Sequence, residues 1–303
     1  MHTPWGDLSV ADAHVHFFSR FFFSALAAQK KAPIESLGPV LAWDIPEDDP
    51  GLLADKWAGE LHGAGVLKAA LIASVPGDHL SVAAAVRKHP ETFYGYAMVN
   101  PLSPESIGQT EAALQSGAIH GLCFFPAMHC YAIQDPRSLA LIELAESKRG
   151  TVVFVHCGAL SVGIRKKLGL PSLFDMRFSN PIDLHAVALR FPQIRFVIPH
   201  FGAGYFRETL MVCDICPNVF LDTSSSNQWM KYHEPALDLS AVFRRALHVV
   251  GPDRLLFGTD SSFFPRGWNR PVFDAQCTAL FELGVDAQLA KKILHDNLIR
   301  LFE

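Results

Sequence analysis

The sequence predicts an α/β protein, a single (β/α)8 barrel of the TIM type over residues 1–303. Short apolar segments alternate with longer amphipathic segments, which is the pattern of parallel strands joined by helices. Several apolar segments are followed at once by a histidine or an aspartate. Because the C-terminal strand ends form the active-site face of such a barrel, this observation also predicts where the site lies. No linker, repeat or low-complexity tract divides the chain, so we expect one domain.

The first predicted strand carries the strongest signal for a site. The segment Asp12-Ala13-His14-Val15-His16 reads as a short strand, in which residues i and i+2 point to the same face. We therefore expect His14 and His16 side by side, with the spacing that suits two ligands of one metal ion. Asp12 shares this face, and we interpret it as a supporting partner rather than a ligand.

The remaining elements follow in order along the chain. A long excursion over residues 17–50, rich in Phe, Pro and Asp, is expected above the site. Apolar runs of strand length predict seven further strands, at residues 68–74, 93–99, 121–125, 151–155, 195–199, 219–223 and 255–259. Amphipathic segments predict helices between them, at residues 52–64, 82–88, 104–115, 137–149, 181–190, 205–214, 239–249 and, in the tail, 272–301.

Three of the later strands also run into a potential ligand, His156, His200 or Asp260. A single histidine at a strand end is usually structural, but the combination with His14 and His16 indicates one shared site. A hydrolytic metal site needs three or four protein ligands and one open position. We assign His14, His16, His156 and Asp260 as ligands. Asp260 could also act as the base, and His200 could bind a second metal, act as acid or base, or orient water.

The ligand chemistry predicts one divalent metal ion. Histidine and carboxylate ligands suit zinc, manganese or iron, and zinc is the first expectation. Cys123 on the predicted fourth strand is a further candidate ligand, but a buried apolar thiol is the preferred interpretation.

The order of the motifs resembles a known family. The segments DAHVHFF, VVFVHCG, RFVIPHFGAG and LLFGTD, with the ending ILHDNLIRLF, are similar to the amidohydrolase superfamily, and to the amidohydrolase-related group that contains aminocarboxymuconate-semialdehyde decarboxylase. The resemblance implies a distorted barrel with metal ligation by His14, His16, His156 and Asp260, and a catalytic or water-positioning role for His200. Binuclear relatives commonly carry a carboxylated lysine or a glutamate on the fourth strand. Residues 121–125 contain neither, which favours one metal.

Two reactions agree with this resemblance. The first expectation is a metal-dependent hydrolase of a small organic substrate, in which metal-activated water attacks a C–N, C–O or C–C bond. The alternative is a non-oxidative decarboxylase of an aromatic or unsaturated carboxylate. The two groups share their ligands, so these residues do not choose between them. A binding protein without catalysis is a third class, against which the intact ligand set argues.

Substrate contacts are expected in the loops that follow the strands. We select Phe17, Arg165, Trp229, Phe264 and Arg266 as the candidates. Aromatic walls with a few cations would suit a small aromatic or unsaturated carboxylate. For each aromatic residue, simple packing of the loop is an equally good interpretation.

Composition narrows the partners and the location. Half of the residues are apolar, 18% are charged and the net charge is −4, which argues against nucleic-acid binding. No apolar run reaches the length of a membrane span. Six cysteines in this length do not form a disulfide framework, so a reducing cytoplasm is expected. The CxxC at residues 213–216 is interpreted as buried thiols. The expected partner is a small-molecule substrate, and a homodimer is left open.

Overall fold

The computed structural model describes residues 1–225 and 227–303. Eight parallel strands form one sheet, and each strand pairs with the next along the chain. The strands are β3 (Ala11–Phe17), β4 (Lys68–Ala73), β5 (Phe93–Val99), β6 (Gly121–Phe124), β7 (Val152–Val155), β8 (Arg195–Ile198), β9 (Val219–Asp222) and β10 (Leu255–Leu256). A short antiparallel pair precedes them, β1 (His2–Thr3) and β2 (Gly6–Asp7).

Single backbone contacts close the sheet between its first and last strands. The N–H of Ala13 donates to the carbonyl of Phe257 at 2.8 Å, and the N–H of His16 donates to the carbonyl of Ser261 at 2.7 Å. Val15 and Ser261 also form a parallel bridge. The predicted barrel is therefore confirmed. β10 is shorter than expected because residues 257–261 contact β3 through separate bonds rather than a continuous ladder.

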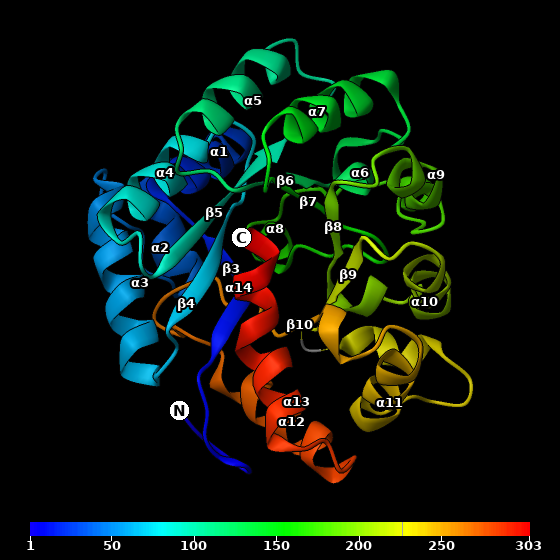
Figure 1. The fold of residues 1–303 in the computed structure, drawn as a ribbon. Helices are drawn as coiled ribbons and strands as arrows, with labels where there is room; N and C mark the ends of the chain where they lie inside the picture. Colours follow the sequence, from blue (N-terminus) through cyan, green and yellow to red (C-terminus); the bar gives the residue numbers. More distant parts are fainter. Residues whose placement is uncertain (226) are drawn as a thin grey trace.

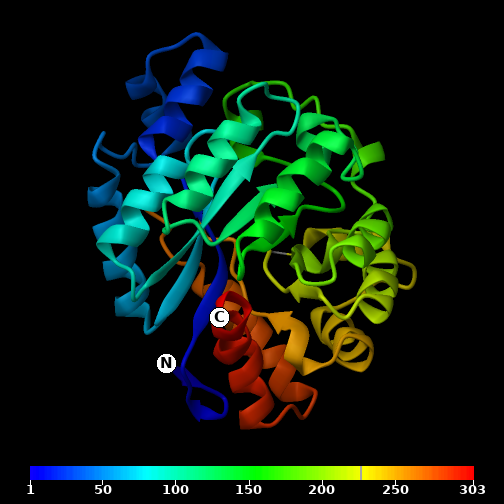
Figure 2. The same ribbon diagram turned by 45° about the horizontal axis from the view of Figure 1, so that its top comes forward.

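Helices surround the sheet on its outer side (Figures 1 and 2). They are α3 (Pro50–Ala64), α4 (His79–Lys88), α5 (Ser106–Gln115), α7 (Pro136–Ser147), α9 (Asp183–Arg190), α10 (Phe206–Ile215), α11 (Leu239–Val249) and α12 (Arg270–Glu282). Short turns of helix lie at α6 (Pro126–His129), η3 (His200–Gly202), η4 (Gln228–Tyr232) and η5 (Pro252–Arg254). No helix in the described part of the chain has the length and apolarity needed to cross a bilayer.

The tail differs from the single helix expected over residues 272–301. The helix α12 ends just before Gly284, which has φ +75°. A residue in this left-handed conformation commonly terminates a helix. Three further segments complete the chain, α13 (Ala287–Lys291), the π-helical turn η6 (Lys292–Asp296) and α14 (Asn297–Phe302). Leu298 and Leu301 of α14 belong to the apolar cluster inside the barrel, so this helix closes the end of the barrel opposite the predicted site.

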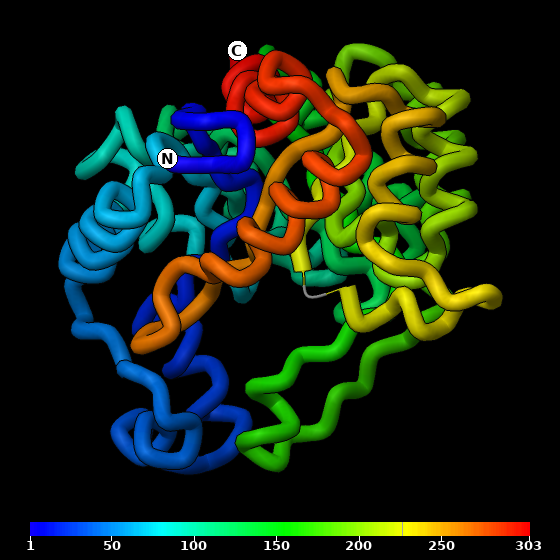
Figure 3. Tube along the Cα trace, turned by 90° about the horizontal axis from the view of Figure 1, so that it is seen from below, coloured from blue at the N-terminus to red at the C-terminus, as the bar shows by residue number. Residues whose placement is uncertain are grey.

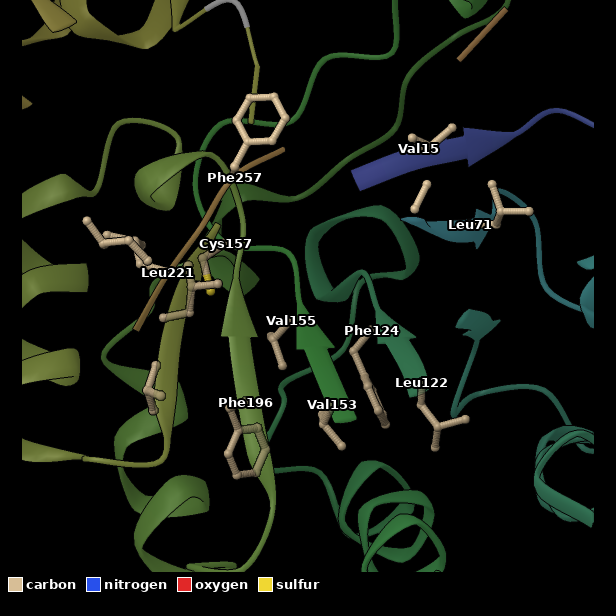
Figure 4. Close-up of a cluster of buried hydrophobic side chains, with 14 of the residues drawn as sticks. Val15, Leu71, Leu122, Phe124, Val153, Val155, Cys157, Phe196, Leu221 and Phe257 are labelled. Carbon is tan, nitrogen blue, oxygen red and sulfur yellow. The ribbon is translucent and has the colours of Figure 1, made fainter. Parts of the chain in front are cut away.

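Successive side chains of each strand point to opposite faces of the sheet, and the apolar ones form two layers. One set of side chains packs between the sheet and the helices, and Figure 4 shows part of it, with Val153, Val155 and Phe196 among the labelled residues. The other set fills the barrel, and it includes Tyr96 and Phe154. All six cysteines are free, and Cys213 and Cys216 are buried, as predicted for the CxxC. The two apolar layers support the strands from both sides. The C-terminal ends of the strands form one edge of the barrel, here called the rim.

Two excursions meet above this rim. The first contains α1 (Arg20–Lys30), η1 (Ile34–Ser36) and α2 (Leu37–Leu41), and the second contains α8 (Gly163–Lys167) and η2 (Met176–Phe178). In Figure 3 they extend beyond the barrel on the same side. Their buried contacts form a separate group, here called the roof cluster, which comprises Phe22, Phe23, Leu26, Ala27, Leu37, Leu41, Ile164 and Leu168.

Candidate metal centre

His14, His16 and Asp260 bring three ligand atoms together at the rim. The Nε2 atoms of the two histidines lie 3.3 Å apart. Oδ1 of Asp260 lies 3.3 Å from Nε2 of His16 and 3.7 Å from Nε2 of His14. Asp260 reaches them because closure of the barrel places its segment beside β3, where its N–H donates to the carbonyl of His14 at 3.0 Å.

These separations fit one ion. Atoms about 2.1 Å from a common ion and about 109° apart lie about 3.4 Å from one another. The three distances of 3.3, 3.3 and 3.7 Å surround this value. The donor set of two imidazoles and a carboxylate also suits zinc or another divalent transition metal. The residues present therefore fit the expected cation.

Bonds behind the imidazoles fix which nitrogen faces the rim. Nδ1 of His14 lies 2.7 Å from Oδ2 of Asp222 at the end of β9. A carboxylate only accepts, so His14 donates through Nδ1 and keeps the Nε2 lone pair free. Burial opposes protonation of His14, but the nearby Asp222 carboxylate raises its pKa. His16 Nδ1 lies 2.9 Å from Oγ of Ser74, whose hydroxyl donates to the carbonyl of Ile72. Ser74 therefore accepts from His16, and Nε2 of His16 is also free to bind a cation.

His200 and His156 stand next to this group. The ring centre of His200 lies 4.9 Å from that of His14 and 5.3 Å from that of His156. Ser224 Oγ lies 2.9 Å from Nδ1 of His200 and 3.0 Å from Nδ1 of His14. Because His14 donates through Nδ1, Ser224 donates to His200, which leaves the Nε2–H of His200 as a donor.

His156 is less closely placed than predicted for a ligand. Its ring stacks on Phe125 with centres 5.3 Å apart, and its buried Nδ1 has no hydrogen-bond partner within the described residues. It does not belong to the group whose ligand atoms all lie within 4.8 Å, which is His14, His16 and Asp260. His156 lines the same cavity, but its ring nitrogens are not as close to the ligand atoms of His14, His16 and Asp260 as those atoms are to one another.

The pKa shifts of Asp260 and of three histidines agree with cation binding, whereas Asp222 raises the pKa of His14, so that a cation would have to displace any proton on this ring. Burial opposes ionisation of Asp260, but the neighbouring imidazoles of His16, His14 and His200 hold its pKa well below the usual range. Burial lowers the pKa values of His16 and His200, and it holds that of His156 well below its ordinary value. An ionised carboxylate and neutral imidazoles are the forms that bind metals.

Asp12 supports the strand rather than the ligand side chains. Its Oδ1 accepts from the N–H groups of His14 and Thr259 at 2.9 and 3.1 Å. Its Oδ2 accepts from the hydroxyl of Thr259 and from Nε1 of Trp268. Burial raises the pKa of Asp12 to about 6, although these bonds oppose the change. Asp12 thereby holds β3 against the segment that carries Asp260.

Gly258 allows these groups to approach one another. A Cβ atom at this position would lie 2.8 Å from Oδ1 of Asp222 and 3.0 Å from the Cβ atoms of His14 and Ser224. Such contacts are closer than packed side chains tolerate. Any larger residue at position 258 would therefore displace the carboxylate that orients His14.

A cavity of about 450 Å³ opens above the rim. All five predicted ligand and catalytic residues line it, namely His14, His16, His156, His200 and Asp260. Its walls carry several aromatic side chains, including Phe18, Phe22, Trp43, Phe125, Trp229 and Phe263. Within the described residues, Lys167 is the one lysine or arginine in the lining. The volume falls in the range of small-molecule sites, about 300–1,000 Å³.

Of the predicted substrate contacts, Trp229 lines this cavity, whereas two aromatic predictions are wrong. Phe17 is completely buried in the layer between the sheet and the helices. It follows His16 in the strand and therefore points away from the rim, whereas Phe18 lines the cavity. Phe264 lies in a neighbouring pocket against Trp57, and Phe263 occupies the cavity wall instead.

The two arginine predictions also miss the cavity lining. Arg165 donates to the carbonyl of Pro171 and to Oε1 of Gln29, which turns its guanidinium away. Arg266 lies behind the wall, with its guanidinium carbon 4.5 Å from the ring centre of Phe263. It donates to the backbone carbonyl of Asp260 at 3.2 Å, so it supports the loop of that ligand.

Sequence reasoning missed the groups that support the histidines. Asp222 ends β9, and the rule that selected His156, His200 and Asp260 at strand ends would have found it. Ser74 directly follows β4 and could have been found in the same way. Lys167 carried no signal that separated it from its basic neighbours, because its position depends on contacts between two excursions.

Comparisons with known proteins show the family and agree with the fold. The model of the family described as Amidohydrolase matches residues 11–303. The protein fluG of Emericella nidulans is 30% identical over 140 residues, which are 41% of this chain and 15% of fluG. This chain thus matches only a small part of that relative's length.

Three solved structures share the fold at low identity. The 5-carboxyvanillate decarboxylase LigW from Sphingomonas paucimobilis has a TM-score of 0.65 and 16% identity, over 98% of this chain and 99% of that one. A probable 2-pyrone-4,6-dicarboxylic acid hydrolase from Acinetobacter baumannii has a TM-score of 0.62 and 14% identity, over 97% of this chain and 99% of that one. An amidohydrolase from Burkholderia multivorans with bound zinc has a TM-score of 0.63 and 13% identity, over 97% of this chain and 99% of that one.

Proposed function

Since the chain belongs to the amidohydrolase family, we propose that it is a metal-dependent hydrolase of a small organic substrate bound in the cavity above the rim. The observation that carries this proposal is the convergence of His14, His16 and Asp260, with ligand atoms 3.3 to 3.7 Å apart. The aromatic cavity directly above them has room for a small molecule and leaves the centre accessible.

His14, His16 and Asp260 would hold the cation, and His156 is the proposed fourth ligand from the same cavity. Zinc is the first choice, with manganese or iron as alternatives. The Burkholderia relative contains zinc, and a 5-carboxyvanillate decarboxylase from Novosphingobium aromaticivorans contains manganese. When bound, the ion would supply Lewis acidity at the rim.

The chain's own residues would move the proton. Asp260 is ionised and partly exposed, and it lines the cavity, so it can accept a proton from water there. His200 presents an Nε2–H, because its Nδ1 accepts from Ser224. It would therefore donate a hydrogen bond to a substrate oxygen as negative charge develops, and Asp222 and Ser74 would keep the two rim histidines oriented.

A decarboxylase is the alternative function, and the cavity gives a reason to keep it. Phe18, Trp43, Phe125 and Phe263 line the walls, and such a surface suits a planar ring. In that reaction the substrate carboxylate would leave as CO2 and a proton would replace it. That proton would come from solvent, and Asp260 or His200 would pass it to the substrate carbon.

One assay separates the two reactions. Metal-loaded protein would be incubated in H2¹⁸O with two probe sets, aromatic carboxylic acids and aromatic esters, lactones and amides. Appearance of ¹⁸O in the organic product without CO2 release would support hydrolysis. Release of CO2 without ¹⁸O in the organic product would select the alternative. The His200→Ala protein and chelator-treated protein are the controls, because both should lose turnover with any true substrate.

The cysteines support a proposed location. All six are free thiols, and five of them are buried. Free thiols persist most readily where glutathione and thioredoxin keep them reduced. We propose the cytoplasm on this ground.

A further inference from the structure

Helix α8 carries three consecutive cations, Arg165, Lys166 and Lys167, and they do not share one environment. The neighbouring residues Ile164 and Leu168 are buried in the roof cluster. Because successive helical residues turn by about 100°, this anchoring places Arg165 and Lys167 on opposite flanks and Lys166 on the outer side. Of the three, Lys167 lines the cavity above the metal centre.

Arg165 is already engaged. Its Nη1 lies 2.8 Å from Oε1 of Gln29, and its Nε and Nη2 donate to the carbonyl of Pro171 at 2.9 and 2.6 Å. These bonds use the guanidinium to join the two excursions, so it is not offered to the cavity.

Lys167 has an aromatic neighbour and, in the part of the chain that the structure describes, no anionic one. Its Nζ lies 5.3 Å from the ring centre of Trp43, which is within the range of a cation–π contact. Among the described residues, no carboxylate lies within ion-pair distance of this ammonium group. Its countercharge is therefore left to solvent or to an occupant of the cavity.

The indole and the backbone beside Lys167 are fixed by contacts, although the residue itself is exposed. Trp43 stacks on Phe263 with ring centres 3.9 Å apart and an angle of 11° between planes, so the indole is fixed to the loop that follows β10. Lys30 Nζ donates to the carbonyl of Leu168 at 2.6 Å, which ties the end of α8 to α1. Lys167 thus extends from a helix end and lies beside an indole that are both fixed, at the edge of the roof cluster.

We propose that Lys167 and Trp43 form an anion subsite that binds a carboxylate of the substrate at the roof of the cavity, away from His14 and His16. This inference rests on the proposed function only in taking the cavity as the substrate site. A substrate with an aromatic body and a carboxylate would place its ring along Trp43 and its anionic group on Lys167. The opposite end of the molecule would then face the rim.

Benzoate and the three benzenedicarboxylate isomers are the probes that test this subsite. The dissociation constant of each would be measured by titration calorimetry with metal-loaded wild type, Lys167→Met, Lys167→Arg and Lys166→Met. Lys166→Met is the matched control, because it removes the same charge from the adjacent, outward position. A benzoate carboxylate can occupy the rim, and only a second carboxylate can reach the roof at the same time.

In the wild type, at least one isomer should bind about fivefold more tightly than benzoate, the upper range for a partly exposed ion pair. Lys167→Met should reduce this ratio to about one, whereas Lys166→Met and Lys167→Arg should keep it. The ratio should also fall as NaCl is raised.

Two results would overturn the subsite. One is a wild type that binds no isomer at least twofold more tightly than benzoate, and the other is a Lys167→Met protein that keeps the ratio. Metal content measured in the same samples keeps this test separate from the proposed function. A wild type that holds no metal would contradict the proposed metal centre. Comparing the isomer-to-benzoate affinity ratio of Lys167→Met with that of Lys166→Met would still test the subsite at the roof.

Discussion

At the residue level, the hydrogen bonds behind the histidines decide how the centre works. Asp222 accepts from Nδ1 of His14, and Ser74 accepts from Nδ1 of His16. Both bonds leave Nε2 unprotonated and aimed at Oδ1 of Asp260. Metal affinity should therefore depend on residues that do not touch the metal.

Replacing Asp222 with Asn should weaken metal affinity by about 10–100-fold, the usual cost of losing such an orienting carboxylate. The amide keeps the volume but no longer stabilises the Nδ1–H form of His14. Competition with a chromophoric chelator would measure the change. Asp214→Asn on the exposed side of α10 is the control, and equal affinities of the two variants would refute an orienting role for Asp222.

Replacing His200 with Ala should leave the metal bound and lower kcat by on the order of 10²–10⁴, the range for a lost acid–base group. The reason is that Nδ1 of His200 contacts Ser224 rather than the group of close ligand atoms. Asp260→Ala should lose metal affinity as well as activity. If His200→Ala released the metal and regained full activity on reloading, His200 would be a ligand.

Neighbouring residues show where sequence reasoning stops at this scale. The period of two in a strand placed His14 and His16 correctly, and extending it by two residues would have chosen Phe18 instead of Phe17. No such period exists in a loop. The sequence therefore does not distinguish Phe263, which lines the cavity, from Phe264, nor Lys167, which also lines it, from Arg165.

At the level of elements, the strands and the barrel helices follow their apolar patterns closely. β5 (Phe93–Val99) and α11 (Leu239–Val249) have the predicted bounds. The roof could not be predicted, because it forms by contact between excursions far apart in the sequence. The tail divides after α12, where Gly284 with its positive φ is the local sequence signal for a helix end.

The starts of α1 and α4 give a prediction about pH. Ser19 caps α1 and donates to Oδ2 of Asp78 at 2.6 Å, while Oδ1 of Asp78 is buried without a partner among the described residues. Burial raises the pKa of Asp78 to about 6, against the hydrogen bonds that lower it. A raised pKa in the folded state means that folding favours the protonated acid. This contribution is complete below about pH 4, the unfolded pKa, and is lost as pH rises through 6.

Asp78→Asn should therefore gain stability relative to the wild type between pH 4 and pH 8, by on the order of 1–3 kcal/mol. Urea unfolding of both proteins across this range would measure the difference, in which shared titrations cancel. A difference that is constant with pH would show that the Asp78 carboxyl does not titrate in this window.

At the level of the whole molecule, the barrel creates the site by joining the two ends of the sequence. His14 and His16 come from β3, and Asp260 follows the last strand. Only closure of the sheet, seen in the bond from Asp260 N–H to the carbonyl of His14, makes them neighbours. The fold and the ligand-bearing strand ends could be predicted because each depends on a local pattern. The cavity walls could not, because they depend on loops packed over the rim.

The central claim is that these joined ends bind one divalent ion. The most direct measurement is elemental analysis of wild type and of a His14→Ala/His16→Ala variant, both purified without chelator and then reloaded with zinc. We predict about one equivalent in the wild type, in line with a single-metal site, and almost none in the folded variant. Two equivalents in the wild type at full occupancy, or one equivalent in both proteins, would contradict the account.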